Sequence, residues 1–144
     1  MKISIKKLST MAKTPEMQTA GSAGADIHAC IDKEIIIRPN ETVKIPTGIA
    51  MEIPDDFSGF VFARSGLATK KGLAPANKVG VIDSDYRGEV MVALHNHSDE
   101  IATVSPGERI AQLVILPRVF AEYVEVENLS NTERGDGGFG STGA

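Results

Sequence analysis

The stretch RIAQLVIL, residues 109–116, is rich in Ile, Val and Leu, and it predicts a buried β-strand. Short runs rich in Val, Ile and Thr recur between turn residues along the rest of the chain, whereas helical periodicity is scarce. The other expected strands cover residues 3–8, 25–30, 34–37, 42–45, 49–53, 59–63, 79–82, 89–94, 100–104 and 123–126. Short strands at this spacing predict an all-β domain, built as a sandwich, barrel or jelly roll.

One segment interrupts the strand series. Ser65 to Lys71, SGLATKK, is expected to form a short helix. The 144 residues contain no visible linker or fixed repeat, so a single domain is expected. Within it we expect a β-structured body over residues 1–133 and a flexible glycine-rich arm over residues 134–144.

Composition excludes several classes of function. The chain has 15 basic and 19 acidic residues, a net charge of -4, which argues against a protein that binds polymeric nucleic acid through a basic stripe. Cys30 is the only cysteine, so no disulfide framework is expected. The first residues, MKISIKKLS, lack the apolar run of a signal peptide. We therefore expect a cytoplasmic location and no membrane association.

The sequence ends in RGDGGFGSTG, residues 134–143. Glycines let backbone N–H groups approach an anion closely, and Arg134, Ser141 and Thr142 add donors for phosphate oxygens. Phe139 offers a flat face for a base. The stretch also matches the dinucleotide-binding GxGxxG pattern, but that motif must open a helix, and here the sequence ends. The segment predicts a lid for a nucleotide with a phosphate chain; the alternative is a frayed terminus.

A second segment that contains candidate catalytic residues is GVIDSDYRG, residues 80–88. Asp83 follows an apolar pair, and partial burial there would leave its carboxylate poorly solvated and able to activate a water molecule. Asp83 and Asp85 could instead share a strand face and bind a metal, or they could simply form a turn. Tyr86 could be a core residue.

Three shorter segments supply polar groups. In ARSGLA, residues 63–68, Arg64 and Ser65 stand at the start of the expected helix, where phosphate is favoured. The alternative is a serine N-cap beside an exposed arginine. Gln112 lies inside an apolar strand and needs hydrogen-bond partners. Asp26 follows a flexible glycine, where a simple turn is the alternative.

The histidine pair and the single cysteine give little indication of function. His95 and His97 are two residues apart and could share a strand face as metal ligands, but no third ligand has sensible spacing. We interpret them as polar residues of a loop. Cys30 is interpreted as a small buried apolar residue.

Taken together, five segments resemble the five motifs of the trimeric dUTPase family, in the family's order. These are SAGADIHA, ARSGLA, NKVGVIDSDYRGEV, GERIAQL and RGDGGFGSTG. The match covers residues 24–143; Ala63 replaces a frequent proline and Ile27 a common leucine. The resemblance implies a distorted jelly-roll β-barrel with one short helix. It also implies a homotrimer whose active sites are shared between subunits.

The resemblance further implies hydrolysis of dUTP to dUMP and pyrophosphate, which keeps uracil out of DNA and supplies dUMP for thymidylate synthesis. Asp83 resembles the general base that activates a water for attack on the α-phosphorus. Asp26 resembles a carboxylate that contacts Mg²⁺ through water, the metal being held mainly by the triphosphate.

Substrate contacts are also implied by the resemblance. Tyr86 resembles the ring that excludes a ribose 2′-hydroxyl, Asn77 the side chain that reads uracil, and Arg134 a γ-phosphate ligand. The full set of implied substrate-binding residues is Arg64, Ser65, Gly66, Asn77, Gly80, Val81, Ile82, Tyr86, Met91, Gln112, Arg134, Phe139, Gly140, Ser141 and Thr142.

Two rival functions use the same fold or site. A dCTP deaminase, alone or combined with diphosphatase activity, shares the fold, but the spacing of Asp83 and Tyr86 and the full glycine-rich fifth motif favour the diphosphatase. A non-catalytic regulator that binds the nucleotide to switch a protein partner is the second alternative.

Overall fold

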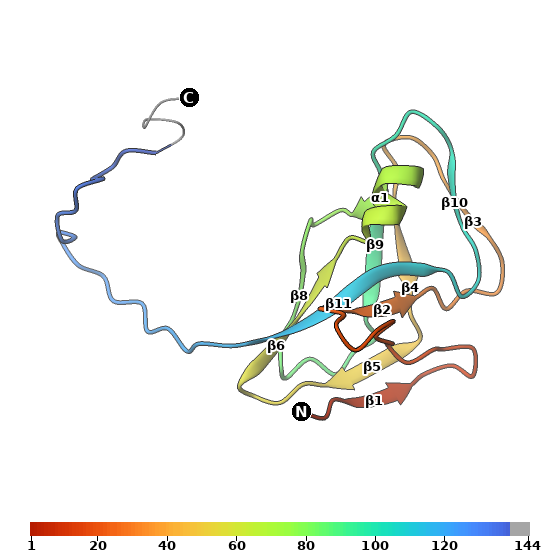
Figure 1. Ribbon diagram of the computed structural model, residues 1–144, viewed down its shortest axis with the longest axis horizontal. Coiled ribbons are helices and arrows are strands. Elements are labelled where there is room, and N and C mark those ends of the chain that lie inside the picture. Colours follow the sequence, from red (N-terminus) through yellow and green to blue (C-terminus); the bar gives the residue numbers. More distant parts are fainter. Residues whose placement is uncertain (139–144) are drawn as a thin grey trace.

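The computed structural model describes residues 1–138, which form eleven β-strands and one short α-helix (Figure 1). The strands are β1 (Ser4–Lys7), β2 (Ala25–His28), β3 (Ile35–Ile37), β4 (Thr42–Pro46), β5 (Ile49–Glu52), β6 (Phe57–Phe62), β7 (Leu73–Pro75), β8 (Gly80–Ile82), β9 (Met91–Asn96), β10 (Ala102–Val104) and β11 (Arg109–Pro117). Hydrogen bonds join the strands of this described part into four antiparallel sheets rather than one closed barrel. The all-β, jelly-roll-like expectation is confirmed.

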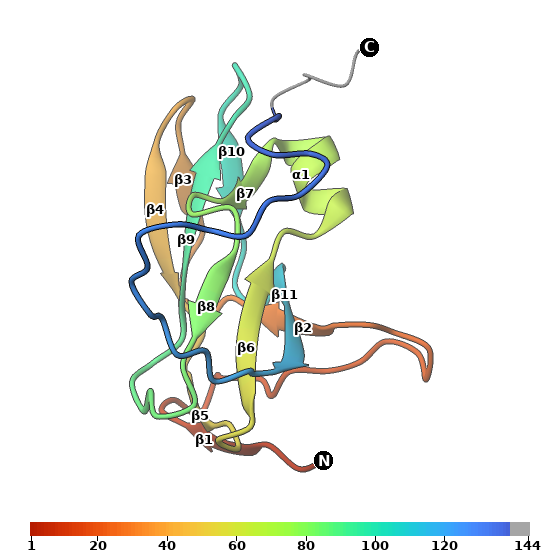
Figure 2. The ribbon, with the colours of Figure 1, turned by 90° about the vertical axis from the view of Figure 1, so that its left-hand side faces the viewer.

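The largest sheet has the strand order β2-β11-β6-β8, and Figure 2 shows these four strands side by side. The predicted strand RIAQLVIL is its longest member, β11, which pairs with β2 on one side and β6 on the other. Ile110 and Ala111 are fully buried, and Leu113 nearly so. The opening interpretation of this stretch as a buried strand is therefore confirmed.

The register of this sheet assigns side chains to its two faces. Gln112 of β11 lies opposite both Phe62 of β6 and Asp26 of β2. The next residue, Leu113, lies opposite Val61. Because directly paired residues point to the same side and successive residues alternate, Asp26 and Gln112 share one face and Val61 lies on the other.

The helix α1 (Ser65–Lys71) is confirmed at its expected position after β6. Its N-cap residue is Arg64, whose side chain makes no capping bond, so the alternative of a serine N-cap at Ser65 is wrong. Gly72 ends the helix with a φ of 65°, and Leu67 is its buried anchor. At seven residues it is too short to cross a bilayer, and no other helix of the described part could do so.

The expected strand at residues 123–126 is wrong. Beyond Pro117 the chain leaves the sheet and runs along residues 118–138 as an extended arm without helix or strand (Figure 1). A strand needs backbone partners, and none of the described strands pairs with this segment. Conversely, the pattern missed β7, whose three residues, LAP, end in a proline.

The turn at Gly48 combines a left-handed backbone with a close approach. Its φ is 68°, its N–H donates to Glu89 Oε1 at 2.7 Å, and its C=O accepts from Leu8 N–H at 2.7 Å. A Cβ atom placed on Gly48 would lie 2.6 Å from Cys30 Sγ and 2.8 Å from the Cβ of Ala12. Only glycine fits this position without displacing its neighbours.

Gly48→Ala is expected to lower the free energy of unfolding by roughly 1–3 kcal/mol, because it adds both strain and overlap. Gly21→Ala is the matched control, since nothing lies within 4 Å of a Cβ added there. Chemical denaturation of both variants checks this; equal stability of the two would contradict the packing described.

Candidate active site

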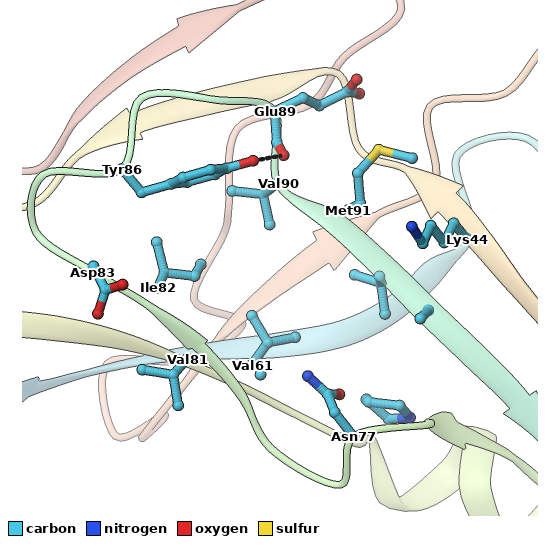
Figure 3. Close-up of a pocket in the computed structure, with 14 residues that line it drawn as sticks. Lys44, Val61, Asn77, Val81, Ile82, Asp83, Tyr86, Glu89, Val90 and Met91 are labelled. Carbon is cyan, nitrogen blue, oxygen red and sulfur yellow. Dashed lines mark hydrogen bonds between the residues drawn. The ribbon is translucent and has the colours of Figure 1, made fainter.

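A cavity with a volume of about 390 Å³ lies beside the loop that connects β8 to β9 (Figure 3). We call this loop, residues 83–90, the hairpin and the space beside it the hairpin cavity. It is lined by Lys44, Val61, Pro75, Asn77, Gly80, Val81, Ile82, Asp83, Tyr86, Glu89, Val90, Met91, Val92 and Ala93. Apolar side chains form most of its wall, with a few polar groups at the rim, as expected of a small-molecule site.

Tyr86 is held over this cavity by the hairpin itself. Its hydroxyl donates to the backbone oxygen of Glu89 at 2.9 Å (Figure 3). A Cβ atom on Gly88 would overlap the phenol ring, so the ring packs directly against a glycine backbone. Tyr86 is 46% exposed. It is therefore a surface ring with a fixed position, and the alternative of a core residue is wrong.

Asp83 lines the same cavity, but it is exposed. The expectation of partial burial is wrong for the single chain, because exposed and buried side chains alternate here: Asp83 lies on the exposed side, between the buried residues Ile82 and Ser84. The carboxylate is therefore solvated in this chain by itself. Any desolvation of Asp83 must come from a bound molecule or from another subunit.

The second cavity has a volume of about 250 Å³ and a mostly polar lining. We call it the arginine cavity. It is lined by Gln18, Ser22, Ala23, Gly24, Asp26, Arg64, Ser65, Gly66 and Gln112. These residues come from the loop before β2, from β2 itself, from the start of α1 and from β11. Gln112 Nε2 donates to the backbone oxygen of Ala63 at 2.8 Å, which supplies the partner that a polar residue in this strand requires.

Asp26 is the electrostatic centre of the arginine cavity. Its side chain is only 10% exposed, and each carboxylate oxygen accepts from an arginine. Arg64 Nε donates to Oδ1 at 2.7 Å, and Arg109 Nη1 donates to Oδ2 at 3.1 Å. Two cations around one carboxylate leave a net positive charge, which suits an anionic ligand. The alternatives of a simple turn at Asp26 and an unpaired exposed Arg64 are both wrong.

A β-bulge explains how Arg109 reaches Asp26. Between Arg109 and Ala111 the pairing of β11 with β2 shifts by one residue. Without the shift, Arg109 would point to the opposite face from Gln112, because the two are three residues apart. The bulge turns Arg109 onto the face that carries Asp26.

The two cavities have no lining residue in common. Asp26 and Gln112 line the arginine cavity from one face of the sheet, whereas Val61 and Ile82 line the hairpin cavity from the other. Val81, which also lines the hairpin cavity, pairs with Phe60 and lies on the face of Gln112, so the hairpin cavity reaches both faces of the edge strand β8.

No metal centre is formed by side chains of residues 1–138. No group of three or more His, Cys, Asp or Glu residues is close enough to hold an ion there. Asp83 and Asp85 lie in the turn after β8, which agrees with the turn alternative. His95 lies in β9 rather than in a loop, and its Nδ1 is 2.8 Å from the hydroxyl of Thr42.

Sequence reasoning identified most of the two linings. The hairpin cavity contains the predicted residues Asn77, Gly80, Val81, Ile82, Asp83, Tyr86 and Met91, and the arginine cavity contains Asp26, Arg64, Ser65, Gly66 and Gln112. Arg134 is exposed in the arm, outside both. Phe139, Gly140, Ser141 and Thr142 lie outside the described residues.

Some functional residues were missed. Arg109 stands inside the motif GERIAQL, but its contact with Asp26 becomes apparent only from the bulge. Ser22 is the first residue of the motif SAGADIHA but was not selected, and Lys44 and Gln18 come from segments without a motif.

Residues 10–143 match the sequence profile of the dUTPase family. The chain belongs to the dUTPase family. It is 52% identical over 144 residues to the deoxyuridine 5′-triphosphate nucleotidohydrolase of Desulfitobacterium hafniense, a match that covers 99% of this chain and 95% of that protein. It is 50% identical to the same enzyme of a Hydrogenobaculum species, with 99% of each chain covered.

Solved structures of dUTPases have the same fold. A dUTPase of Staphylococcus bacteriophage 80alpha, determined with dUpNHpp, superimposes with a TM-score of 0.90 at 30% identity, covering 99% of each chain. A dUTPase of phage phi11, in which a structural Mg(II) ion is described, has a TM-score of 0.79 at 25% identity, covering 88% of this chain and 97% of that one.

His28 is a buried titratable group beside this dUTPase-family site. It lies two residues after Asp26 on β2, is 9% exposed, and its Nδ1 has no hydrogen-bond partner. Burial lowers the pKa of His28, and the nearby cations Lys13 and Arg109 lower it further, against the opposing effects of Asp26 and Glu16. The imidazole is therefore neutral in the folded protein at neutral pH.

Since the folded-state pKa of His28 lies below its unfolded value of 6.5, the unfolded chain binds the extra proton first as pH falls. This contribution to stability is complete above that value and is lost as pH falls below it. His28→Asn is expected to reduce the loss of unfolding free energy between about pH 7.5 and about pH 5.5. Denaturation at a series of pH values checks this; an unchanged pH slope would contradict it.

Proposed function

We propose that the chain hydrolyses dUTP to dUMP and pyrophosphate. The observation that carries the proposal is the hairpin cavity, in which a carboxylate, Asp83, stands beside a fixed tyrosine ring at the mouth of a cleft lined by apolar side chains. In a chain of the dUTPase family, this is the arrangement that a nucleoside and an attacking water would use.

The hairpin cavity would receive the deoxyuridine. Asn77, with backbone groups of the hairpin, would read the uracil edge, while Gly80, Val81, Ile82 and Met91 form the surrounding wall. The ring of Tyr86 would pack under the sugar and leave no space for a 2′-hydroxyl. Because its hydroxyl and the Gly88 backbone fix the ring, discrimination against UTP would come from a rigid wall.

The arginine cavity would receive the phosphates. Arg64, Ser65, Gly66 and Gln112 line it, and the net positive charge around Asp26 compensates a protein whose overall charge is -4. Arg134 and the following residues to Thr142 would add γ-phosphate contacts and a ring over the uracil, so that residues 134–144 act as a lid.

Asp83 would act as the general base. It orients a water for in-line attack on the α-phosphorus and takes its proton as the new P–O bond forms. The bond from the α-phosphorus to the oxygen bridging to the β-phosphate breaks, and pyrophosphate leaves with that electron pair. Binding of the nucleotide would remove the water that surrounds Asp83 in the free chain.

Mg²⁺ does not fit Asp26 as a direct ligand. Both of its oxygens are already bonded to arginines, and the residues of the described part form no metal cluster. We propose that Mg²⁺ is held mainly by the triphosphate and contacts Asp26 only through water, which agrees with the preference of this ion for phosphate oxygens and water.

We propose that the complete site is built in a homotrimer. The two cavities have no lining residue in common, which supports a site in which the hairpin cavity of one subunit meets the arginine cavity of another. The extended arm supports assembly too, because Phe120 is 75%, Tyr123 95% and Leu129 86% exposed. Apolar side chains in such numbers favour burial against another subunit.

The biological role follows from the reaction. Removal of dUTP would keep uracil out of DNA, and the dUMP formed would serve thymidylate synthesis. The cytoplasmic location expected from the sequence fits this role. A deaminase would instead release ammonia from dCTP, so measurement of ammonia separates the two activities.

Asp83→Asn is expected to bind dUTP nearly as well as the parent while turnover falls about a hundredfold or more, because an amide cannot accept the proton. We would also measure pyrophosphate release by the parent protein from dUTP, UTP, dTTP and dCTP. We expect a strong preference for dUTP. Comparable turnover of UTP would contradict the role of Tyr86. Full activity of the Asp83 variant would contradict the role of the carboxylate.

A further inference from the structure

A third cavity adjoins the arginine cavity on the side of α1. Its volume is about 320 Å³, and it is lined by Arg64, Gly66, Leu67, Lys70, Lys71, Glu108 and Arg109. We call it the lysine cavity. It shares Arg64 and Gly66 with the arginine cavity, so the two spaces are neighbours across one guanidinium group. None of the sequence motifs pointed to this cavity as a whole.

The charges around the lysine cavity do not cancel. Lys71 Nζ donates to Glu108 Oε1 at 2.6 Å, so this pair is neutral. Arg64 and Arg109 share the single carboxylate of Asp26, which leaves one positive charge in excess.

Lys70 adds a second positive charge. It is an exposed lysine in the last turn of α1, and no residue of the described part forms an ion pair or hydrogen bond with it.

The geometry also keeps these cations in place. Arg64 Nη1 donates to the backbone oxygen of Arg109 at 3.3 Å, which ties the two arginines together. Lys71 Nζ donates in addition to the backbone oxygen of Thr103 at 3.0 Å, so its stem covers one side of the cavity. Within residues 1–138, the head group of Lys70 makes no such contact and can follow a ligand.

We propose that the lysine cavity is a binding site for inorganic pyrophosphate. The inference rests on the proposed hydrolysis of dUTP, which releases pyrophosphate beside Arg64. Once the bond to the α-phosphorus is broken, pyrophosphate is no longer tethered to the nucleoside, and the neighbouring excess of positive charge offers it an exit from the phosphate cavity. In a protein of net charge -4, a local excess of positive charge is needed to attract a compact polyanion.

The test is calorimetric titration of inorganic pyrophosphate into the full-length, nucleotide-free protein at low salt. Lys70→Gln is expected to raise the dissociation constant about tenfold or more, as for loss of one hydrogen bond to a charged group. It should also weaken the salt dependence of binding. Lys70→Arg should retain parental affinity. Lys33→Gln, at another exposed lysine, is the matched control and should bind like the parent.

Equal affinity of Lys70→Gln and the parent would overturn the proposal, and so would an equal loss in Lys33→Gln, which would indicate only a general charge effect. Thermal unfolding of each variant verifies the fold. Pyrophosphate binding can be measured without hydrolysis of dUTP. The experiment therefore tests the pyrophosphate site independently of the proposed function. A parent that does not hydrolyse dUTP contradicts the proposed function, whereas an unaffected Lys70 variant contradicts only the lysine cavity.

Discussion

The alternation of side chains across the sheet β2-β11-β6-β8 is the constraint on which the site depends. Gln112 and Asp26 must point to one face because they are paired in register, and Val61 must point to the other. The nucleoside-sized cavity lies at the edge strand β8, and the positively charged cavity lies across β2 and β11, so the two have no lining residue in common. In the proposed trimer, a single nucleotide would join the two cavities from different copies of the chain.

Within the positively charged half, the carboxylate of Asp26 organises its surroundings. A buried carboxylate costs free energy unless it is paired, and here two arginines pair with it. In return, the carboxylate holds Arg64 and Arg109 at the rim of adjoining cavities, where like charges would otherwise repel. The bulge in β11 is essential to this arrangement, because it brings Arg109 to the face of Asp26. A local irregularity of the backbone thus creates a functional cluster of charges.

Much of this arrangement could be predicted from the sequence, and the failures have physical causes. The strand RIAQLVIL and the helix at Ser65 follow from local pattern, and about half of the residues that line the two cavities follow from the motifs and the family resemblance. The partner of Asp26 does not, because a bulge leaves no clear signature in one sequence. The strand expected near Tyr123 failed because apolar alternation indicates strand propensity, but a strand also needs a neighbour.

The exposure of Asp83 has the same kind of cause. An apolar neighbour in the sequence does not imply burial, because successive side chains alternate, and Asp83 is exposed between the buried residues Ile82 and Ser84. In the proposed trimer, the same carboxylate would become desolvated when the nucleotide binds. The two cavities of the single chain would then be two halves of one active site.

Subunit mixing tests this central claim most directly. Asp83→Asn disables the hairpin cavity and Arg64→Gln the arginine cavity, and each variant by itself should be nearly inactive. If complete sites form between subunits, mixed oligomers from equal amounts of the two variants should recover about one quarter of the parental dUTP turnover, since random assembly pairs two intact halves at that frequency. If mass spectrometry confirms mixed oligomers and no activity returns, the site lies within one chain and the account is wrong.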